Sequence, residues 1–203
     1  MLEGGGTVII ADEEGGANTL LEALGAGMRI SSGNISSVDM EFSSPRTLIA
    51  TVSSNHTLLE GVWTLAFNRP SYIEGGVPLA KTSILSWNDQ SGTGRPGSGG
   101  SLSRYTLVAH EFVGSGEVIL ISDASLFATT MQQVRRLHDN RQFLLNMLDS
   151  DGTVVVDAIY GRPADAEGPA YFVHKIKSAP ISTIVIIFLL MLLVAALFKK
   201  QIL

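Results

Sequence analysis

Three aspartates in this chain each follow a short apolar run, and their carboxylates are the side chains best placed for chemistry. Asp12, Asp123 and Asp157 end runs that are rich in valine and isoleucine. If these runs are parallel strands, their carboxyl ends meet at one edge of a sheet, where open α/β folds bind ligands. Alternatively, the aspartates cap the helices that follow, as the residues after Asp123 suggest.

Other polar residues lie close to the predicted strand ends and would line the same crevice. Asn18 follows the first acidic loop, and Asp139 and Asn140 open a later helical segment beside His138. The predicted set of ligand-binding residues is therefore Asp12, Asn18, Asp123, Asp139, Asn140 and Asp157.

The sequence does not supply a recognisable catalytic or metal site. The chain has no cysteine and no G-x-S-x-G nucleophile motif, and its four histidines lie far apart along the sequence. We therefore expect no catalytic residue, no metal site and no cofactor. The alternative is a hydrolase that uses Asp123 or Asp157 with His138 or a bound cation.

Hydrophobic periodicity predicts the elements that would position these residues. Strands are expected at 7–11, 47–52, 62–67, 79–85, 105–112, 117–122 and 153–156, and helices at 18–24, 124–131 and 139–148. The fifth and sixth strands flank a Val-Gly-Ser-Gly turn and should form a hairpin. Trp63 and Trp87 are expected in the core. Buried runs that alternate with helical patterns predict an α/β fold with a largely parallel, doubly wound sheet.

The last apolar run covers residues 181–198 without a charge and ends at Lys199 and Lys200. Extended back to Ser178, it would form a helix about 31 Å long, which matches the hydrocarbon core of a bilayer. We therefore predict a single-pass C-terminal membrane anchor at 178–198, with the side of the preceding domain undecided. The net charge is −5 and every acidic residue precedes this run, which argues against a nucleic-acid partner.

Several short motifs resemble a family of bacterial and archaeal membrane-anchored proteins that contain a domain of unknown function. The motifs are GGGTVIIAD at 4–12, NTLL at 18–21, AKTS at 80–83, GSGEVILISD at 114–123 and DNRQF at 139–143. The resemblance implies a class I glutamine-amidotransferase-like, flavodoxin-like domain that here lacks its first strand–helix unit. It also implies kinship with domains of gliding-motility transporters and of intraflagellar transport. Membrane-protein or MoxR-type ATPase partners are implied as well.

These observations together predict a membrane-anchored, non-catalytic module that binds a ligand or a partner protein. Amidotransferase activity is excluded because its nucleophile is a cysteine. The expected organisation is an α/β domain at 1–160 with a flexible Gly/Ser loop at 88–103, a linker at 161–177, the anchor, and a basic tail at 199–203. A further alternative is a truncated family member without function.

Overall fold

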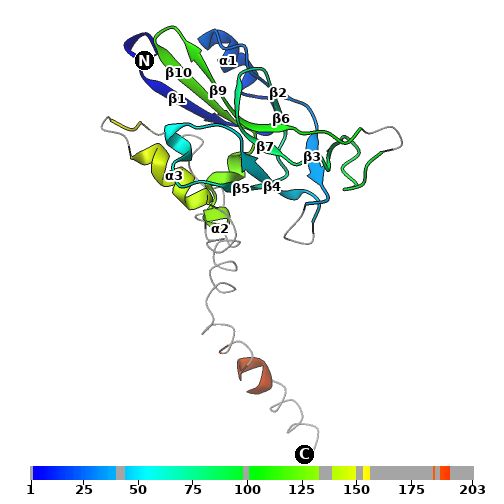
Figure 1. Cartoon of the computed structure of the whole chain (residues 1–203). Coiled ribbons are helices and arrows are strands. Elements are labelled where there is room, and N and C mark those ends of the chain that lie inside the picture. Colours follow the sequence, from blue (N-terminus) through cyan, green and yellow to red (C-terminus); the bar gives the residue numbers. More distant parts are fainter. Residues whose placement is uncertain are drawn as a thin grey trace, which may run out of the picture. The chain divides into compact units, whose positions relative to one another are not determined.

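The computed structural model describes residues 2–39, 44–97, 101–132, 139–149, 153–155, 185 and 188–192. The chain divides into two compact units, Met1–Val154 and Val155–Leu203. The strands of the first unit are β1 Thr7–Ala11, β2 Arg29–Ser31, β3 Asn34–Ser37, β4 Thr47–Val52, β5 Thr64–Asn68, β6 Tyr72–Glu74, β7 Val77–Thr82, β8 Ser86–Asp89, β9 Thr106–Val113 and β10 Gly116–Ile121. Its α-helices are α1 Asn18–Leu24, α2 Thr129–Gln132 and α3 Asn140–Leu148, and its 3-10 helices are η1 Leu2–Gly4, η2 Thr57–Leu59 and η3 Ala124–Phe127 (Figure 1).

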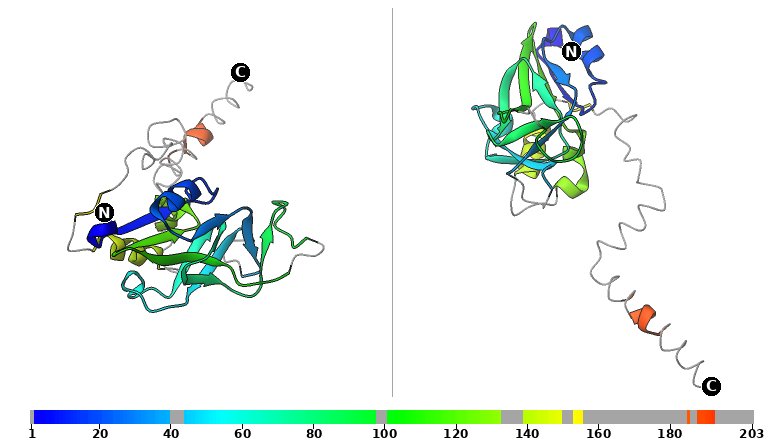
Figure 2. Two further views of the ribbon diagram at one scale, coloured as in Figure 1. Left: turned by 90° about the horizontal axis from the view of Figure 1, so that it is seen from above. Right: turned by 90° about the vertical axis from the view of Figure 1, so that its right-hand side faces the viewer.

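The main sheet is mixed and contains six strands in the order β1-β10-β9-β7-β4-β5. β1 and β10 run parallel, whereas every other neighbouring pair in this sheet is antiparallel. Two small antiparallel sheets, β2-β6 and β3-β8, accompany the main sheet, and Figure 2 shows the arrangement from two further directions.

Local sequence signals account for the elements that were predicted well. The strand 7–11 and the helix 18–24 are present as β1 and α1, and Gly25 ends the helix in the left-handed region at φ 80°. A glycine without a Cβ adopts this conformation at little cost. The predicted hairpin is confirmed as β9 and β10, and Asp123 caps η3 with its side chain, as the capping alternative required.

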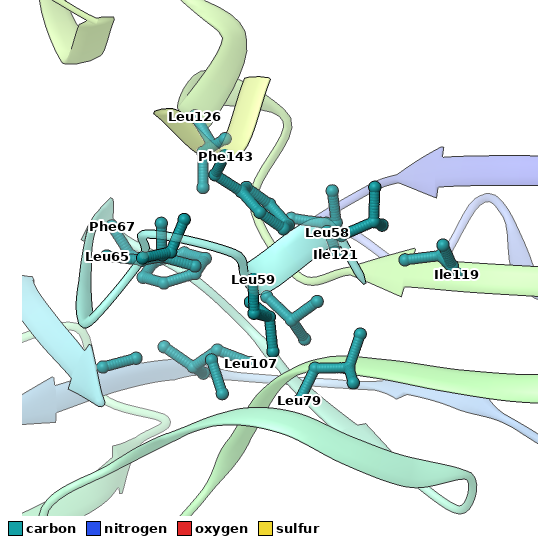
Figure 3. Packing of buried hydrophobic residues seen from close by; sticks show 14 of the residues in the cluster. Leu58, Leu59, Leu65, Phe67, Leu79, Leu107, Ile119, Ile121, Leu126 and Phe143 are labelled. Carbon is teal, nitrogen blue, oxygen red and sulfur yellow. The ribbon is translucent and has the colours of Figure 1, made fainter. Parts of the chain in front are cut away.

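Two hydrophobic cores lie against the main sheet, one on each face. The larger core takes Ile119 and Ile121 from β10, while the smaller core takes Val118 and Leu120 from the same strand. In Figure 3, Phe143 of α3 lies within the larger core, where Ile119 and Ile121 are labelled too. Helix α1 contributes to the smaller core instead. Because successive side chains of a strand point to opposite faces, β10 is buried on both.

This double burial explains why the predicted fold class is wrong. A continuous apolar run was taken as a sign of a parallel, flavodoxin-like sheet, but an antiparallel strand covered on both faces has the same pattern. Parallel neighbours need crossover connections of a dozen or more residues, usually helical. β4 and β5 are joined instead by a loop that holds the 3-10 helix η2, and β9 and β10 by a two-residue turn. The fold is therefore β-rich and mixed, not doubly wound.

The predicted membrane anchor at 178–198 is not supported. Val185 and residues 188–192 are helical, and the rest of that range lies outside the described residues. No helix in the described part of the chain is long and apolar enough to cross a membrane. Apolar composition supplies one requirement of a span, but a span also needs about 20 residues in one continuous helix. The single-pass membrane localisation, which was predicted from the length and apolar character of this run, is therefore not supported.

Two smaller predictions also fail. Residues 153–155 form no strand, and the side chain of Val155 is 74% exposed. Trp63 is 77% exposed, whereas Trp87 is buried as expected. Apolar character alone does not decide burial, because much of a folded protein's surface is apolar.

Candidate functional site

The outer edge of strand β5 is occupied by side chains that were predicted to bind a ligand. Asn140, which is buried, accepts a hydrogen bond from Ala66 N–H at 2.8 Å and donates one to the Ala66 carbonyl at 2.9 Å. Asp139 accepts a bond from Thr64 N–H at 3.2 Å, and its own N–H donates to the Thr64 carbonyl at 2.9 Å. Because β5 ends the sheet, alternate backbone groups point away from β4, and these two residues satisfy them.

Asp123 continues the same row at the next alternate residue. Its carboxylate accepts a 2.6 Å bond from Asn68 N–H and a 2.8 Å bond from Ser125 N–H, and its side chain is completely buried. Burial raises the pKa of Asp123, the hydrogen bonds from Ser125 and Asn68 act in the opposite direction, and the Glu13 carboxylate adds to the increase. We call Asp123, Asp139 and Asn140 the β5 edge set. They take the place of a neighbouring strand.

Asn18 and Asp12 organise the region around α1 in a similar way. Asn18 accepts a bond from Ile30 N–H at 2.8 Å and donates one to the Ile30 carbonyl at 2.9 Å, which repeats the pairing of Asn140. The Asp12 carboxylate accepts bonds from Glu14 N–H and Ala17 N–H and thereby shapes the loop before the helix. Both side chains are engaged with the backbone.

The structure brings some of the predicted site residues together and separates others. Asp12 follows β1 and Asp123 follows β10. These two strands are parallel and paired up to Ala11 and Ile121, so the two aspartates lie at the same carboxyl end of the sheet, as expected. Asn18 is held at β2 and does not join the β5 edge set. The remaining predicted residues, Asp157 and His138, lie outside the described residues.

A second group of polar side chains was not found by sequence reasoning. His56, His110 and Glu117, which we call the His–Glu cluster, place one potential ligand atom each within 4.8 Å of one another. Glu117 Oε1 lies 3.0 Å from His56 Nε2 and 2.5 Å from His110 Nδ1. The two imidazole rings meet edge to face with centroids 4.9 Å apart. The three side chains are between 13% and 15% exposed, so solvent still reaches them.

Each member of the His–Glu cluster is fixed by a different element. His110 lies on β9 opposite Ile119 of β10, and Glu117 lies near the start of β10. His56 caps η2, and its Nδ1 accepts a bond from Leu58 N–H at 3.2 Å. His56 and Glu117 are 61 positions apart, so no local spacing motif could have revealed the group.

The His–Glu cluster and the β5 edge set occupy different ends of the molecule's central strands. Glu117 is near the first residue of β10, whereas Asp123 follows its last residue. At about 3.3 Å per residue, the strand from Glu117 to Ile121 alone separates the Cα atoms of these two residues by about 13 Å, and Asp123 lies beyond Ile121. Neither His56 nor His110 can therefore share a reacting atom with Asp123.

Asp89 is a buried carboxylate that shapes the glycine-rich segment after β8. It accepts bonds from Ser91 Oγ at 3.0 Å, Thr93 N–H at 3.1 Å and Gly94 N–H at 2.6 Å. Burial raises the pKa of Asp89, but the hydrogen bonds from Gly94, Ser91 and Thr93 outweigh it and hold the pKa below its ordinary value. The start of the predicted loop 88–103 is thus tied to a strand.

Comparison with known proteins gives a family and a fold likeness. A family model described as "Domain of unknown function (DUF4350)" matches residues 1–148. The solved structure of the mmIFT52 N-terminal domain is similar with a TM-score of 0.52 and 14% sequence identity, over 75% of this chain and 69% of that chain. No curated protein sequence matches. At this identity the structural likeness shows the fold alone.

Proposed function

The chain belongs to the DUF4350 family, and from this membership and the bonding of its strand-end residues we propose that it is a non-catalytic module that binds a partner protein. The observation that carries the proposal is the role of Asp12, Asn18, Asp123, Asp139 and Asn140. Each of them bonds to backbone N–H or C=O groups. A general acid or base must instead reach the substrate's proton with a free polar atom.

The same bonding weighs against the alternative of a hydrolase built on strand-end aspartates. Such an enzyme would need Asp123 to leave its bonds with Asn68 N–H and Ser125 N–H before it could act on a substrate. Each lost bond to a buried carboxylate costs on the order of 1.5–3 kcal/mol. The amidotransferase-like fold that the resemblance implies would likewise serve this chain only as a scaffold. The chain has no cysteine, and the amidotransferase reaction needs a cysteine nucleophile.

Exposed aromatic side chains offer a means of binding a partner protein. Trp63 is 77% exposed and Phe112 is 71% exposed. Large aromatic residues dominate the binding energy of many protein interfaces. The family resemblance makes a MoxR-type ATPase the first partner to test.

A pull-down from a lysate of the source cells, followed by binding to the purified ATPase, tests the proposal. We expect the wild-type chain to retain a stoichiometric partner, and Trp63→Ala or Phe112→Ala to weaken that binding at least tenfold. Leu20→Ala is the matched control, since it removes a half-exposed apolar side chain from α1. Failure of the folded wild-type chain to retain any stoichiometric partner would count against the proposal.

A further inference from the structure

We propose that the His–Glu cluster binds one divalent transition-metal ion of the Zn²⁺ class. The ligands would be His56 Nε2, His110 Nδ1 and a carboxylate oxygen of Glu117, with a fourth position open to water or to a partner's side chain. Two imidazoles and one carboxylate are a common ligand set for zinc and for non-haem iron. This inference goes beyond the proposed function and does not depend on it.

The distances within the cluster are close to those that a bound ion requires. Zinc–nitrogen and zinc–oxygen bonds of about 2.0–2.2 Å in a tetrahedron place the ligand atoms about 3.3 Å apart. Glu117 Oε1 is now 3.0 Å from His56 Nε2 and 2.5 Å from His110 Nδ1. Bonds at the long end of that range place the ligand atoms about 3.6 Å apart, so binding requires the two contacts of Glu117 to lengthen by up to about 1 Å. It also requires the two histidine nitrogens, which lie within 4.8 Å of each other, to settle at the same spacing.

The elements that carry the ligands are rigid, so little ordering is needed. β9, which carries His110, is paired on both sides, with β7 and with β10. The backbone N–H of Glu117 donates to the Gly6 carbonyl at 3.1 Å beside β1. His56 precedes Leu58 and Leu59, which are buried in the larger core. A preformed ligand set loses less entropy on binding than one drawn from mobile loops.

The charge of the cluster also favours a cation. In the part of the chain that the structure describes, the carboxylate of Glu117 contacts the two histidine rings and forms no salt bridge with a lysine or an arginine. When both imidazoles are neutral, no positive charge compensates this carboxylate in a site that is mostly shielded from water. A divalent ion would neutralise the carboxylate and coordinate both rings.

Metal binding has a specific consequence for the protons of the cluster. Leu58 N–H donates to His56 Nδ1 at 3.2 Å, so in this arrangement the ring proton of neutral His56 is on Nε2, facing Glu117. Coordination through Nε2 moves that proton to Nδ1, and the contact with Leu58 N–H must open because two donors would then face each other. The proton of His110 moves in the same way from Nδ1 to Nε2.

Titration of the full chain, prepared without a polyhistidine tag, with ZnCl₂ in a calorimeter tests the site. We expect one zinc ion per chain and no binding of MgCl₂, since magnesium prefers oxygen ligands. Glu117→Gln and His110→Gln should each weaken zinc binding by at least about 100-fold, because loss of an outer-shell group alone costs 10–100-fold. Glu22→Gln removes the same charge from an exposed position on α1 and should bind like wild type.

Two spectroscopic measurements separate this site from adventitious binding. Co²⁺ should give the visible absorption of a tetrahedral complex, and the amide signal of Leu58 should shift on addition of zinc to the wild-type chain. The proposal is overturned if the folded wild-type chain binds no zinc, or if zinc binds while the Leu58 amide does not respond. Folded Glu117→Gln and His110→Gln variants with wild-type affinity would overturn it as well.

Discussion

Replacement of Asn140 by aspartate tests whether the β5 edge set stabilises the fold. The two side chains have nearly the same shape, so Asn140→Asp keeps an oxygen to accept from Ala66 N–H. It replaces the amide that donates to the Ala66 carbonyl with a carboxylate oxygen, which would face that carbonyl at 2.9 Å. The substitution thus changes one donor into an acceptor within a buried pair.

The expected cost follows from three contributions. Loss of the hydrogen bond from the Asn140 amide costs about 1 kcal/mol, and the Ala66 carbonyl left without a donor costs about 1–3 kcal/mol more. The introduced carboxylate is also an uncompensated buried charge, and in broken buried ion pairs such a charge costs about 3–5 kcal/mol. We therefore expect Asn140→Asp to lower the free energy of unfolding by about 3–5 kcal/mol at neutral pH.

Urea denaturation of the full chain across a pH series would measure this cost. Burial raises the pKa of the introduced carboxyl in the folded state, so the folded chain takes up a proton before the unfolded chain does. Its protonated form can donate to the Ala66 carbonyl, and the lost stability should return as the pH falls through the folded-state pKa. Asn55→Asp, at an exposed position, should change stability by less than about 0.5 kcal/mol. Equal stability of the two variants at neutral pH would refute the reasoning.

Three further substitutions probe other parts of the fold. Phe143→Ala should lower the free energy of unfolding by about 3–5 kcal/mol in urea denaturation, because the ring is fully buried; a loss below about 1 kcal/mol would contradict its place in the core. Asp89→Asn should destabilise the chain at neutral pH, and the stability difference from wild type should shrink as the pH falls through the folded-state pKa of Asp89, which lies below the ordinary value. A stability difference that does not change with pH in thermal unfolding would count against the hydrogen bonds that the Asp89 carboxylate accepts. Gly76→Ala should lower the melting temperature, because Gly76 has φ 69° and an added Cβ would lie 2.6 Å from Met28 Sδ; an unchanged melting temperature would argue against that backbone conformation.

Local sequence signals predicted the elements whose residues interact with near neighbours. The turn at Gly114 joins β9 to β10, Gly25 ends α1, and Asp123 caps η3 through Ser125 N–H, two residues away. These signals are local because hydrogen bonds within a turn or cap depend on residues only a few positions apart. The order of the strands in the sheet depends instead on packing, since both cores take residues from β10.

The roles of the candidate site residues depend on contacts that are distant in sequence. Asn140 pairs with Ala66, 74 positions away, and Asn18 pairs with Ile30, 12 positions away. In the sequence, a polar residue that satisfies an edge strand looks the same as one that binds a ligand. His56 and His110 could not be paired either, because their rings come into contact only in the folded chain, where the residue that caps η2 meets a residue of β9.

The β5 edge set also limits how this protein can associate with itself. A second copy that tried to extend the sheet at β5 would have to displace Asp123, Asp139 and Asn140 from the backbone of that strand. Displacement of Asp123 and Asn140, which are buried, would cost their hydrogen bonds to the strand before any intermolecular ladder could form. Fibril-like growth from this end of the sheet is therefore opposed by three short side chains at the starts of η3 and α3, which occupy this edge in place of another strand.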